Sequence, residues 1–421
     1  GAPARRFVDW LAECGQTYWQ VLPVNPADGY GSPYAGLAAF AGNTCLLEKD
    51  PEEVLAELRD ADDDPDYQAF LEKNKYWLTP YATFRAIKDL LGEGPWQEWP
   101  DAYARFSPGL ARRVELADGV DRHRKLQYEF QREWDDLKAY ANERGVKIVG
   151  DMPMYVSGDS ADVWAERDIF ELDEKGYAQV QAGCPGDGFD PEGQLWGNPT
   201  YRWDVLAARG YDWWLARLER AVETYDYVRL DHFIGFSSYY KIAKGKPARE
   251  GSFSFGPGLD LFRAAYQKLG PLPFIAEDLG VITPAVRALI AETGIPGMDI
   301  VQFSDGDVRE GYEPKPGTVT FTGTHDNQTL LGFCQSRFGL EGDEAAQMAD
   351  RIAASVLGSK NDVAIMPLQD VLGLDDAARM NVPGVAEGNW SWRAEEQDVL
   401  LATERLKELA RAAGRFREVS A

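Results

Sequence analysis

Cysteine and histidine are scarce in this chain of 421 residues, and positive charge is in deficit. There are four cysteines and three histidines, and 69 acidic side chains against 44 lysines and arginines give a net charge of −25 at pH 7. No two cysteines form a C-x-x-C pair, so we expect neither a zinc knuckle nor a dithiol redox motif. The negative charge repels nucleic acid and anionic membranes, whereas a neutral substrate meets no such penalty.

Targeting signals and long apolar runs are also missing. The sequence shows no signal-peptide pattern and no apolar run of 18 residues, so we expect no membrane segment. The four thiols, Cys14, Cys45, Cys184 and Cys334, are widely spaced, which is typical of a reducing compartment. These features together indicate a cytoplasmic location.

Aromatic residues are abundant by contrast. The chain has 13 Trp, 19 Tyr and 19 Phe within a hydrophobic fraction of 44%, which is enough for a large core. We expect most of these rings to pack inside the protein, although exposed rings are also suited to stacking on sugars.

Short apolar segments alternate with helical ones along most of the chain. Phe7, Trp10, Leu11 and Cys14 recur at helical spacing, so the chain opens with a helix, and residues 50–146 are mostly helical and acidic. Strand–helix alternation favours a parallel sheet. The predicted strands are residues 18–22, 147–151, 227–231, 274–277, 300–303, 319–323 and 363–366.

The pattern predicts an α/β fold of the (β/α)₈ TIM-barrel type with helical insertions. A closed barrel needs eight strands, and seven are found. Because the chain opens with the helix that would follow a first strand, we expect that strand to lie upstream of Gly1. We interpret residues 1–421 as a single catalytic barrel domain, with a mostly helical insertion subdomain at 50–146. An open doubly wound sheet is the alternative.

Three carboxylates lie where predicted strands end: Asp231, Glu277 and Asp326. The carboxyl ends of barrel strands are where active sites are built. One such residue alone would more often be a helix cap or a salt-bridge partner. Because burying a charge is costly, three at strand–loop junctions favour a catalytic set.

Two of the three histidines directly follow or precede these carboxylates, in Asp231-His232 and His325-Asp326. A neutral imidazole can hydrogen-bond to a sugar hydroxyl without adding charge. We therefore interpret His232 and His325 as substrate-binding residues, whereas His123 is explained as a core histidine.

Charge around two of the carboxylates suggests different roles. Arg229 precedes Asp231 by two residues and shares its face of the strand, so we expect it to lower the pKa of Asp231 and keep this group ionised. Glu277 would need a raised pKa to donate a proton, and burial or the adjacent Asp278 would provide it.

Many short motifs, in this order, resemble those of the amylomaltases, also called disproportionating enzymes or 4-α-glucanotransferases. No single motif is decisive, but their number and order are specific, and the resemblance covers almost the whole chain. They include Tyr-Trp-Gln-Val-Leu-Pro at 18–23, Gly-Tyr-Gly-Ser-Pro-Tyr at 29–34, Gly-Asp-Met-Pro-Met-Tyr-Val-Ser at 150–157, Gly-Gln-Leu-Trp-Gly-Asn-Pro at 193–199, Arg-Leu-Asp-His-Phe at 229–233, Ala-Glu-Asp-Leu-Gly at 276–280, Gly-Thr-His-Asp-Asn at 323–327, Ala-Arg-Met-Asn at 378–381 and Glu-Gly-Asn-Trp at 387–390.

The resemblance implies a retaining transfer of an α-1,4-glucan segment to the 4-hydroxyl of an acceptor glucan or glucose. Asp231 matches the family nucleophile and Glu277 the acid/base, and Asp326 matches the carboxylate that steadies the transition state. Residues matching sugar contacts of the family are Tyr30, Tyr34, Trp196, Arg229, His232, His325 and Asn381. Trp196 would serve equally well as a structural residue of its loop.

Maltooligosaccharides and α-1,4-glucans are the implied partners, and we expect no metal and no organic cofactor. Three other functions are weighed: an α-amylase-type hydrolase with water as acceptor, a metal-dependent barrel such as a sugar isomerase, and a non-catalytic glucan-binding module. The products formed from maltotriose separate the transferase from the hydrolase, chelation tests the metal, and removal of Asp231 tests the binding module.

Overall fold

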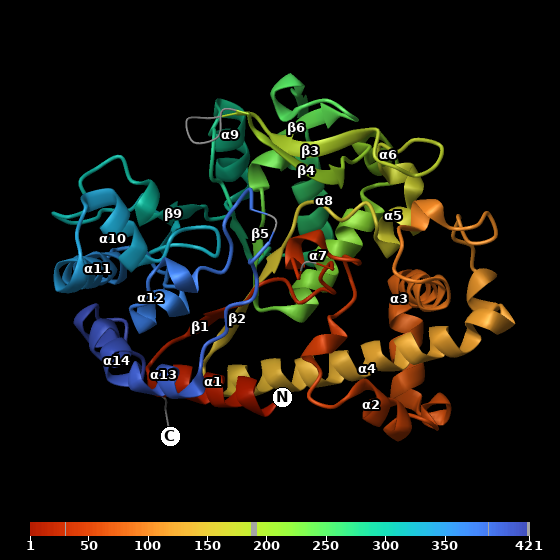
Figure 1. The fold of residues 1–421 in the computed structure, drawn as a ribbon, viewed down its shortest axis with the longest axis horizontal. Helices are drawn as coiled ribbons and strands as arrows, with labels where there is room; N and C mark the ends of the chain where they lie inside the picture. The colour runs from red at the N-terminus through yellow and green to blue at the C-terminus, as the bar shows by residue number, and fades with distance from the viewer. Residues whose placement is uncertain (30, 187–191, 386, 419–421) are drawn as a thin grey trace.

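Parallel strands form the centre of the molecule (Figure 1). The computed structural model describes all residues except 30, 187–191, 386 and 419–421. One sheet has the order β1-β2-β5-β8 and a second has the order β11-β10-β9. A parallel bridge between Ala276 and Gly297 joins β8 to β9. These strands are β1 (Tyr18–Gln20), β2 (Lys147–Met152), β5 (Tyr227–Leu230), β8 (Phe274–Ala276), β9 (Met298–Ile300), β10 (Val319–Phe321) and β11 (Ala364–Ile365).

The seven strands therefore follow one another around the sheet in sequence order, as the sequence predicts. All pairings between them are parallel, and α-helices lie in every connection except that from β9 to β10, which is the arrangement of a (β/α)₈-type barrel. Within the described residues, β1 and β11 each pair on one side only.

Helices surround these strands, and both chain ends lie at the lower edge of the view in Figure 1. Helix α9 shows how local sequence fixes an element. The Thr283 side chain accepts a hydrogen bond from the Val286 N–H, Pro284 is the first helical residue, and Gly294 ends the helix in a left-handed conformation. The α-helices are α1 (Ala2–Glu13), α2 (Pro51–Glu57), α3 (Pro65–Leu91), α4 (Val114–Glu143), α5 (Ala161–Ala165), α6 (Trp203–Ala208), α7 (Asp212–Thr224), α8 (Leu259–Leu269), α9 (Pro284–Thr293), α10 (Leu330–Phe338), α11 (Gly342–Leu357), α12 (Leu368–Leu372), α13 (Glu396–Leu401) and α14 (Thr403–Ala412).

The predicted strand at 300–303 departs furthest from the structure, whereas the other six differ from the observed strands by at most two residues at either end. The prediction placed a strand at 300–303, but β9 ends at Ile300 and residues 301–303 form a 3₁₀ turn. The Gln302 side chain donates to the carbonyls of Thr322 and Gln328 at 3.0 and 2.9 Å. This amide therefore fastens the turn to the end of β10 in place of a longer strand.

The segment between β1 and β2 is helical, with α2, α3 and α4 at the lower right of Figure 1. The apolar face of α4, which includes Phe130 and Trp134, is buried. The Trp134 Nε1 donates to the Thr224 carbonyl at 2.8 Å and so ties α4 to the end of α7. Lys88 of α3 is almost fully buried and pairs with Asp159, beyond β2, at 2.6 Å.

A separate, antiparallel sheet with the order β4-β3-β6-β7 lies at the top of Figure 1, on the side to which β5 runs. No strand of this sheet is among those predicted from the sequence. Strands β3 and β4 shift register where they pair, which weakens the alternating pattern a sequence would show. Its strands are β3 (Val180–Cys184), β4 (Gln194–Pro199), β6 (Ser238–Ala243) and β7 (Ser252–Phe255).

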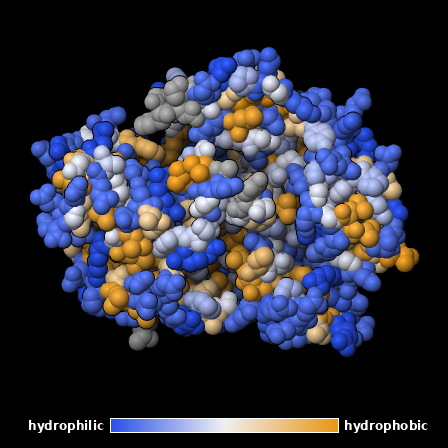
Figure 2. All heavy atoms as spheres, viewed as in Figure 1, coloured by the Kyte–Doolittle hydropathy of each residue, from blue (hydrophilic) through white to orange (hydrophobic). Residues whose placement is uncertain are grey.

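Hydrophilic residues predominate on the face shown in Figure 2, and the hydrophobic ones form separate small patches. Within the described residues, none of the helices combines the length and the apolar character needed to cross a membrane.

Candidate active site

The nucleus of the site is a buried ion pair between neighbouring strands. Asp151 in β2 and Arg229 in β5 are side by side in the ladder, and both side chains are at most 5% exposed. The guanidinium Nη1 donates to both carboxylate oxygens of Asp151, at 2.9 and 2.7 Å. The Tyr34 hydroxyl donates to the same carboxylate at 2.7 Å. Arg229 is thereby fixed, since a charge buried in this way needs its partners.

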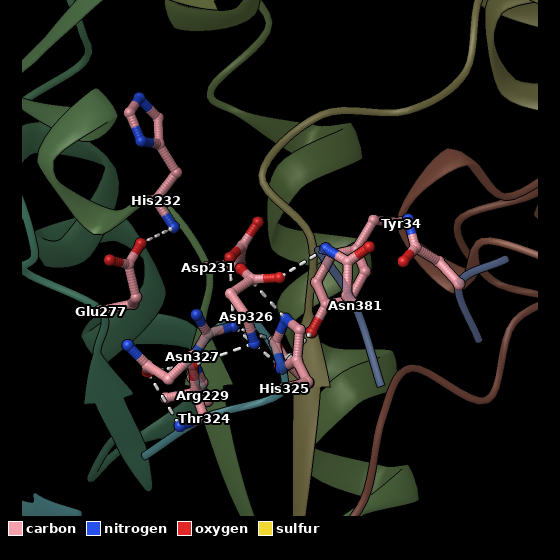
Figure 3. Close-up of polar contacts among 12 residues, drawn as sticks. Tyr34, Arg229, Asp231, His232, Glu277, Thr324, His325, Asp326, Asn327 and Asn381 are labelled. Carbon is pink, nitrogen blue, oxygen red and sulfur yellow. Dashed lines mark hydrogen bonds and ion pairs between the residues drawn. The ribbon is translucent and has the colours of Figure 1, made fainter. Parts of the chain in front are cut away.

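Asp231 follows β5 directly and lies beside this pair. The Arg229 Nη1 donates to its Oδ1 at 3.1 Å, so the guanidinium is shared between Asp151 and Asp231. The Asp231 side chain is 26% exposed and is therefore reachable, in contrast to Asp151. Figure 3 shows Asp231 near the centre of the group, with Glu277 on one side and Tyr34 on the other.

Glu277 follows β8, the neighbour of β5, and its carboxylate is hydrogen-bonded to the backbone of His232, the residue after Asp231. The His232 N–H donates to Glu277 Oε2 at 2.6 Å, and the Leu279 N–H donates to Oε1 at 3.2 Å. His232 has φ +49°, a left-handed conformation that is uncommon outside glycine and tends to cluster at functional sites. Because β5 and β8 pair directly, the two carboxylates lie at adjacent strand ends, and the hydrogen bond orients Glu277 there.

Asp326 comes from the loop after β10 and completes the set of three. The Asn381 Nδ2 donates to Asp326 Oδ1 at 2.6 Å, and His325 Nε2 lies 3.4 Å from Oδ2. Asn381 itself is held by a hydrogen bond from its N–H to the His325 carbonyl at 3.1 Å. The carboxylate is thus oriented by groups on both sides (Figure 3).

The three carboxyl groups have different proton affinities. Burial raises the pKa of Asp231 to about 6 and that of Glu277 to about 8, and in each case Arg229 opposes the rise. Burial also acts on Asp326, but His325, Asn381 and Arg229 outweigh it, so the pKa of that group lies well below its ordinary value. At neutral pH, Asp231 and Asp326 are ionised and Glu277 carries a proton.

One electrostatic expectation is wrong. Arg229 was expected to bring the pKa of Asp231 below its usual value, and the net shift is upward because burial exceeds the effect of the guanidinium. Asp151 adds to the rise, since its negative charge is also close to Asp231. Asp231 is still ionised at neutral pH, as predicted, but its pKa of about 6 lies closer to neutral pH than the prediction assumed.

Aromatic rings flank the carboxylates in two groups. The Trp196 ring meets His232 edge-on at 5.0 Å, and burial lowers the pKa of His232 to about 4, so the imidazole is neutral. Its Nε2 is buried and accepts or donates no hydrogen bond among the described residues. On the other side, Tyr34 stacks on His325 at 5.0 Å and lies 5.6 Å from Trp390. Flat rings and an unpartnered nitrogen are suited to sugar rings and hydroxyls.

Most residues predicted for the site are brought together by direct contacts or through His232. Tyr30 lies outside the described residues. Asp151 and Trp390 are functional candidates that the prediction left out, although both stand within motifs it quoted, at 150–157 and 387–390. Asp151 is a carboxylate inside a strand next to Arg229, which could have been taken as a signal. No cluster of three or more His, Cys, Asp or Glu side chains suited to a metal ion occurs in the described part of the chain.

Comparisons with known proteins agree on one family. A family model described as 4-alpha-glucanotransferase matches residues 1–64 and 52–398. A 4-alpha-glucanotransferase of Streptococcus pneumoniae is 39% identical over 96% of this chain and 91% of its own, and one of Thermus thermophilus is 38% identical over 93% and 90%. An amylomaltase of Streptococcus agalactiae, solved in complex with acarbose, is similar with a TM-score of 0.89 at 33% identity, over 99% of this chain and 96% of that one.

Proposed function

Since the chain belongs to the 4-alpha-glucanotransferase family and is a glycosyl-transferring enzyme, we propose that it moves α-1,4-glucan segments by a double displacement on Asp231. Maltooligosaccharides and α-1,4-glucans are its substrates. The observation that carries the mechanism is the hydrogen bond from His232 N–H to Glu277, which holds this carboxyl beside the strand end that carries Asp231. Burial keeps Glu277 protonated at neutral pH, whereas Asp231 stays ionised.

Asp231 acts as the nucleophile in this proposal. A carboxylate must be ionised to attack an anomeric carbon, and a pKa of about 6 leaves Asp231 ionised at neutral pH. Arg229 binds one of its oxygens and so orients the attack. The bond from the anomeric carbon to the leaving glucan breaks as the bond to Asp231 forms.

Glu277 acts first as the acid and then as the base. Its pKa of about 8 means that it carries a proton at neutral pH, and that proton goes to the 4-oxygen of the departing glucan. In the second step the same carboxylate takes the proton of an acceptor 4-hydroxyl, which attacks the anomeric carbon and releases Asp231. The configuration is retained because the carbon is inverted twice.

The remaining site residues bind the sugar. Asp326 is ionised over the whole working range and is positioned by Asn381 and His325, which suits it to bind hydroxyls of the distorted ring and steady positive charge in the transition state. The unpartnered Nε2 of His232 is suited to a sugar hydroxyl, and Tyr34 and Trp196 offer ring faces nearby. We assign Tyr30 the same role on the motif alone.

We propose further that residues 1–421 act as one catalytic barrel domain, with 50–146 as a helical subdomain fastened by the Lys88–Asp159 pair. A cytoplasmic location is proposed as well. The thiols Cys14, Cys45 and Cys334 form no disulfide, which fits a reducing compartment.

Chromatography of the products from maltotriose tests the proposed function. A transferase yields glucose together with chains longer than maltotriose, because an acceptor sugar takes the segment from the enzyme. A hydrolase of the α-amylase type yields only shorter chains. Shorter chains alone would therefore overturn the proposal, and an unchanged substrate would leave only a binding role.

A further inference from the structure

Three aromatic rings adjoin one another beside the catalytic candidates. The centroids of the Tyr155 and Trp196 rings lie 6.2 Å apart, and those of Tyr155 and His232 are also separated by 6.2 Å. The Trp196 ring meets His232 edge-on at 5.0 Å. Each ring is thus a neighbour of the other two, and we call them the three-ring cluster. Tyr155 comes from the loop after β2 and Trp196 from β4, whereas His232 directly follows Asp231.

Two polar atoms of this cluster have no hydrogen-bond partner among the described residues: the Tyr155 hydroxyl and the Nε2 of His232. Both atoms are buried, and a buried polar atom without a partner costs stability, so folded proteins keep few of them. The Tyr155 ring is fixed, because it is 7% exposed and stacks on the buried Tyr201 at 6.0 Å. Two such atoms on neighbouring rings indicate a ligand that pairs with both of them.

The cluster lies on the acid/base side of the site. The His232 N–H holds the carboxyl of Glu277 at 2.6 Å. In Figure 3, Glu277 and His232 lie on one side of Asp231, and Asn381 lies on the other. The carboxylate bonded to Asn381 is assigned above to the sugar ring that is transferred, whereas Glu277 is assigned to the 4-oxygen of the glucan that leaves or arrives. A sugar that meets the His232 imidazole is therefore the leaving or the acceptor sugar.

The two unpartnered groups suit a neutral hydroxyl. Burial raises the pKa of the Tyr155 hydroxyl well above its ordinary value, and the charge of the nearby Asp231 adds to the rise, so the hydroxyl keeps its proton. Burial also lowers the pKa of His232 to about 4, so the imidazole is neutral at pH 7. A phenol and a neutral imidazole can each donate to or accept from a sugar hydroxyl, and no charge has to be desolvated.

Trp196 is the outermost member of the cluster. It is 37% exposed, whereas Tyr155 is 7% exposed. The indole Nε1 donates to Gln194 Oε1 at 3.0 Å, which is an exposed hydrogen bond within the same strand. The next residue, Gly197, has φ +84°, a left-handed conformation that glycine adopts without strain. The Trp196 ring therefore stands between solvent and the two unpartnered atoms, and an exposed bond holds it there.

We propose that Tyr155 and His232 together bind one hydroxyl of the acceptor sugar, and that this sugar displaces the Trp196 ring from them. The inference rests on the proposed function, because it needs an acceptor that attacks through its 4-hydroxyl. With the 4-hydroxyl at Glu277, the hydroxyl bound by the pair is one of the two that flank it, on C3 or C6. A sugar replaces the ring contacts that Trp196 gives up, and a water molecule does not. The pair thus favours transfer to a sugar over hydrolysis.

Labelled acceptors test which hydroxyl is bound. The donor is α-maltosyl fluoride at saturating concentration, and transfer is measured as label from glucose, 3-deoxyglucose, 6-deoxyglucose or 2-deoxyglucose in the trisaccharide product. We expect the 3-deoxy or the 6-deoxy analogue to have an acceptor kcat/KM about 10- to 100-fold below that of glucose, because it leaves two buried polar groups unpaired. 2-Deoxyglucose should resemble glucose, since its missing hydroxyl lies away from C4. If all three analogues match glucose, the proposal is wrong.

Tyr155→Phe separates a binding role from a structural one, because it removes the hydroxyl and keeps the ring that stacks on Tyr201. We expect the KM for glucose as acceptor to rise about 3- to 10-fold, and the penalty of the deoxy analogue to fall by a similar factor. The Tm should stay the same or rise, since the lost hydroxyl has no partner among the described residues. The matched control is Tyr201→Phe, whose hydroxyl donates to the Met154 carbonyl at 2.8 Å; it should lower the Tm and keep the acceptor preference.

Tryptophan fluorescence during a glucose titration tests the displacement of Trp196. The emission of the parent should change with saturation, and this change should be absent in Trp196→Phe. A change of equal size in both proteins would contradict the displacement. A lower Tm of Tyr155→Phe with unchanged acceptor kinetics would show that the hydroxyl is structural and overturn the proposal. If the parent forms no labelled trisaccharide from glucose, the proposed transfer itself fails and this inference with it.

Discussion

Asp151 positions Arg229, which in turn contacts Asp231, and the change Asp151→Asn tests this role. Its carboxylate accepts two hydrogen bonds from Arg229 and one from the Tyr34 hydroxyl, and the side chain is 1% exposed. The asparagine has the same shape but no charge, so Arg229 loses a charged partner in the interior. The guanidinium can then move toward Asp231, which it already contacts at 3.1 Å.

Two effects of this change can be given a size and a direction. Removing one partner of a buried ion pair costs about 3 to 5 kcal/mol of stability, and the isosteric amide should give a value near 3. Hydrogen bonds to charged groups contribute about 1.5 to 3 kcal/mol, so misplacement of Arg229 should lower kcat/KM by about 10- to 100-fold. Because Asp151 raises the pKa of Asp231, its neutralisation should also move the acid limb of the pH profile below 6.

The assay is the initial rate of maltotriose disproportionation between pH 4.5 and 9, with unfolding by denaturant in parallel. Asp162→Asn is the matched control. Asp162 is also a buried carboxylate, 7% exposed, but it accepts a hydrogen bond from the Ala39 N–H and has no bond to Arg229. We expect the Asp162→Asn variant to be less stable than the parent but to keep the acid limb of its pH profile unchanged. An acid limb that stays in place or rises in Asp151→Asn, or an equal shift in the control, would refute the reasoning.

The strand ends that carry the catalytic candidates could be predicted from the sequence. Asp231 and Glu277 each follow a short apolar run, and such runs form the inner strands of an α/β fold. The bounds of helix α9 are likewise fixed locally, since Pro284 at its start and Gly294 after its end are signals that need no tertiary partner. What could be predicted was therefore local in sequence.

The features that escaped prediction depend on contacts between distant segments. The role of Asp151 requires Arg229, 78 residues further on, and Tyr34, 117 residues before. The direction of the pKa shift of Asp231 depends on how completely the surrounding segments exclude water, which no short motif records. Strands β3 and β4 of the antiparallel sheet pair with an irregular register, which weakens the alternating pattern in their sequence.

Three further predictions follow from the same contacts. The pH profile of kcat/KM should be bell-shaped, because activity needs Asp231 to be deprotonated, above pH about 6, and Glu277 to be protonated, below pH about 8. Rates measured across this pH range check the prediction, and a profile with a single limb would contradict the assignment. Lys88→Met should lower the free energy of unfolding, measured in urea, by about 2 to 3 kcal/mol, since Lys88 is buried and its partner Asp159 is partly exposed. Lys246→Met, at an exposed ion pair, should lower it much less, and similar losses in the two variants would contradict this. Dialysis against a chelator should leave the transfer rate unchanged, because the carboxylates have complete roles in glycosyl transfer; a large loss restored by one metal would refute that.

The identity of the nucleophile is the central claim, and one measurement tests it most directly. Glu277→Gln removes the proton donor, but a donor such as α-maltosyl fluoride needs no protonation of its leaving group. We expect this variant to react with the fluoride and accumulate a glycosyl-enzyme, seen by intact mass and mapped to Asp231, while it cleaves maltotriose about 10²- to 10⁴-fold more slowly than the parent. Asp231→Asn should form no adduct. An adduct in Asp231→Asn but none in Glu277→Gln, or an adduct mapped to another residue, would contradict the account.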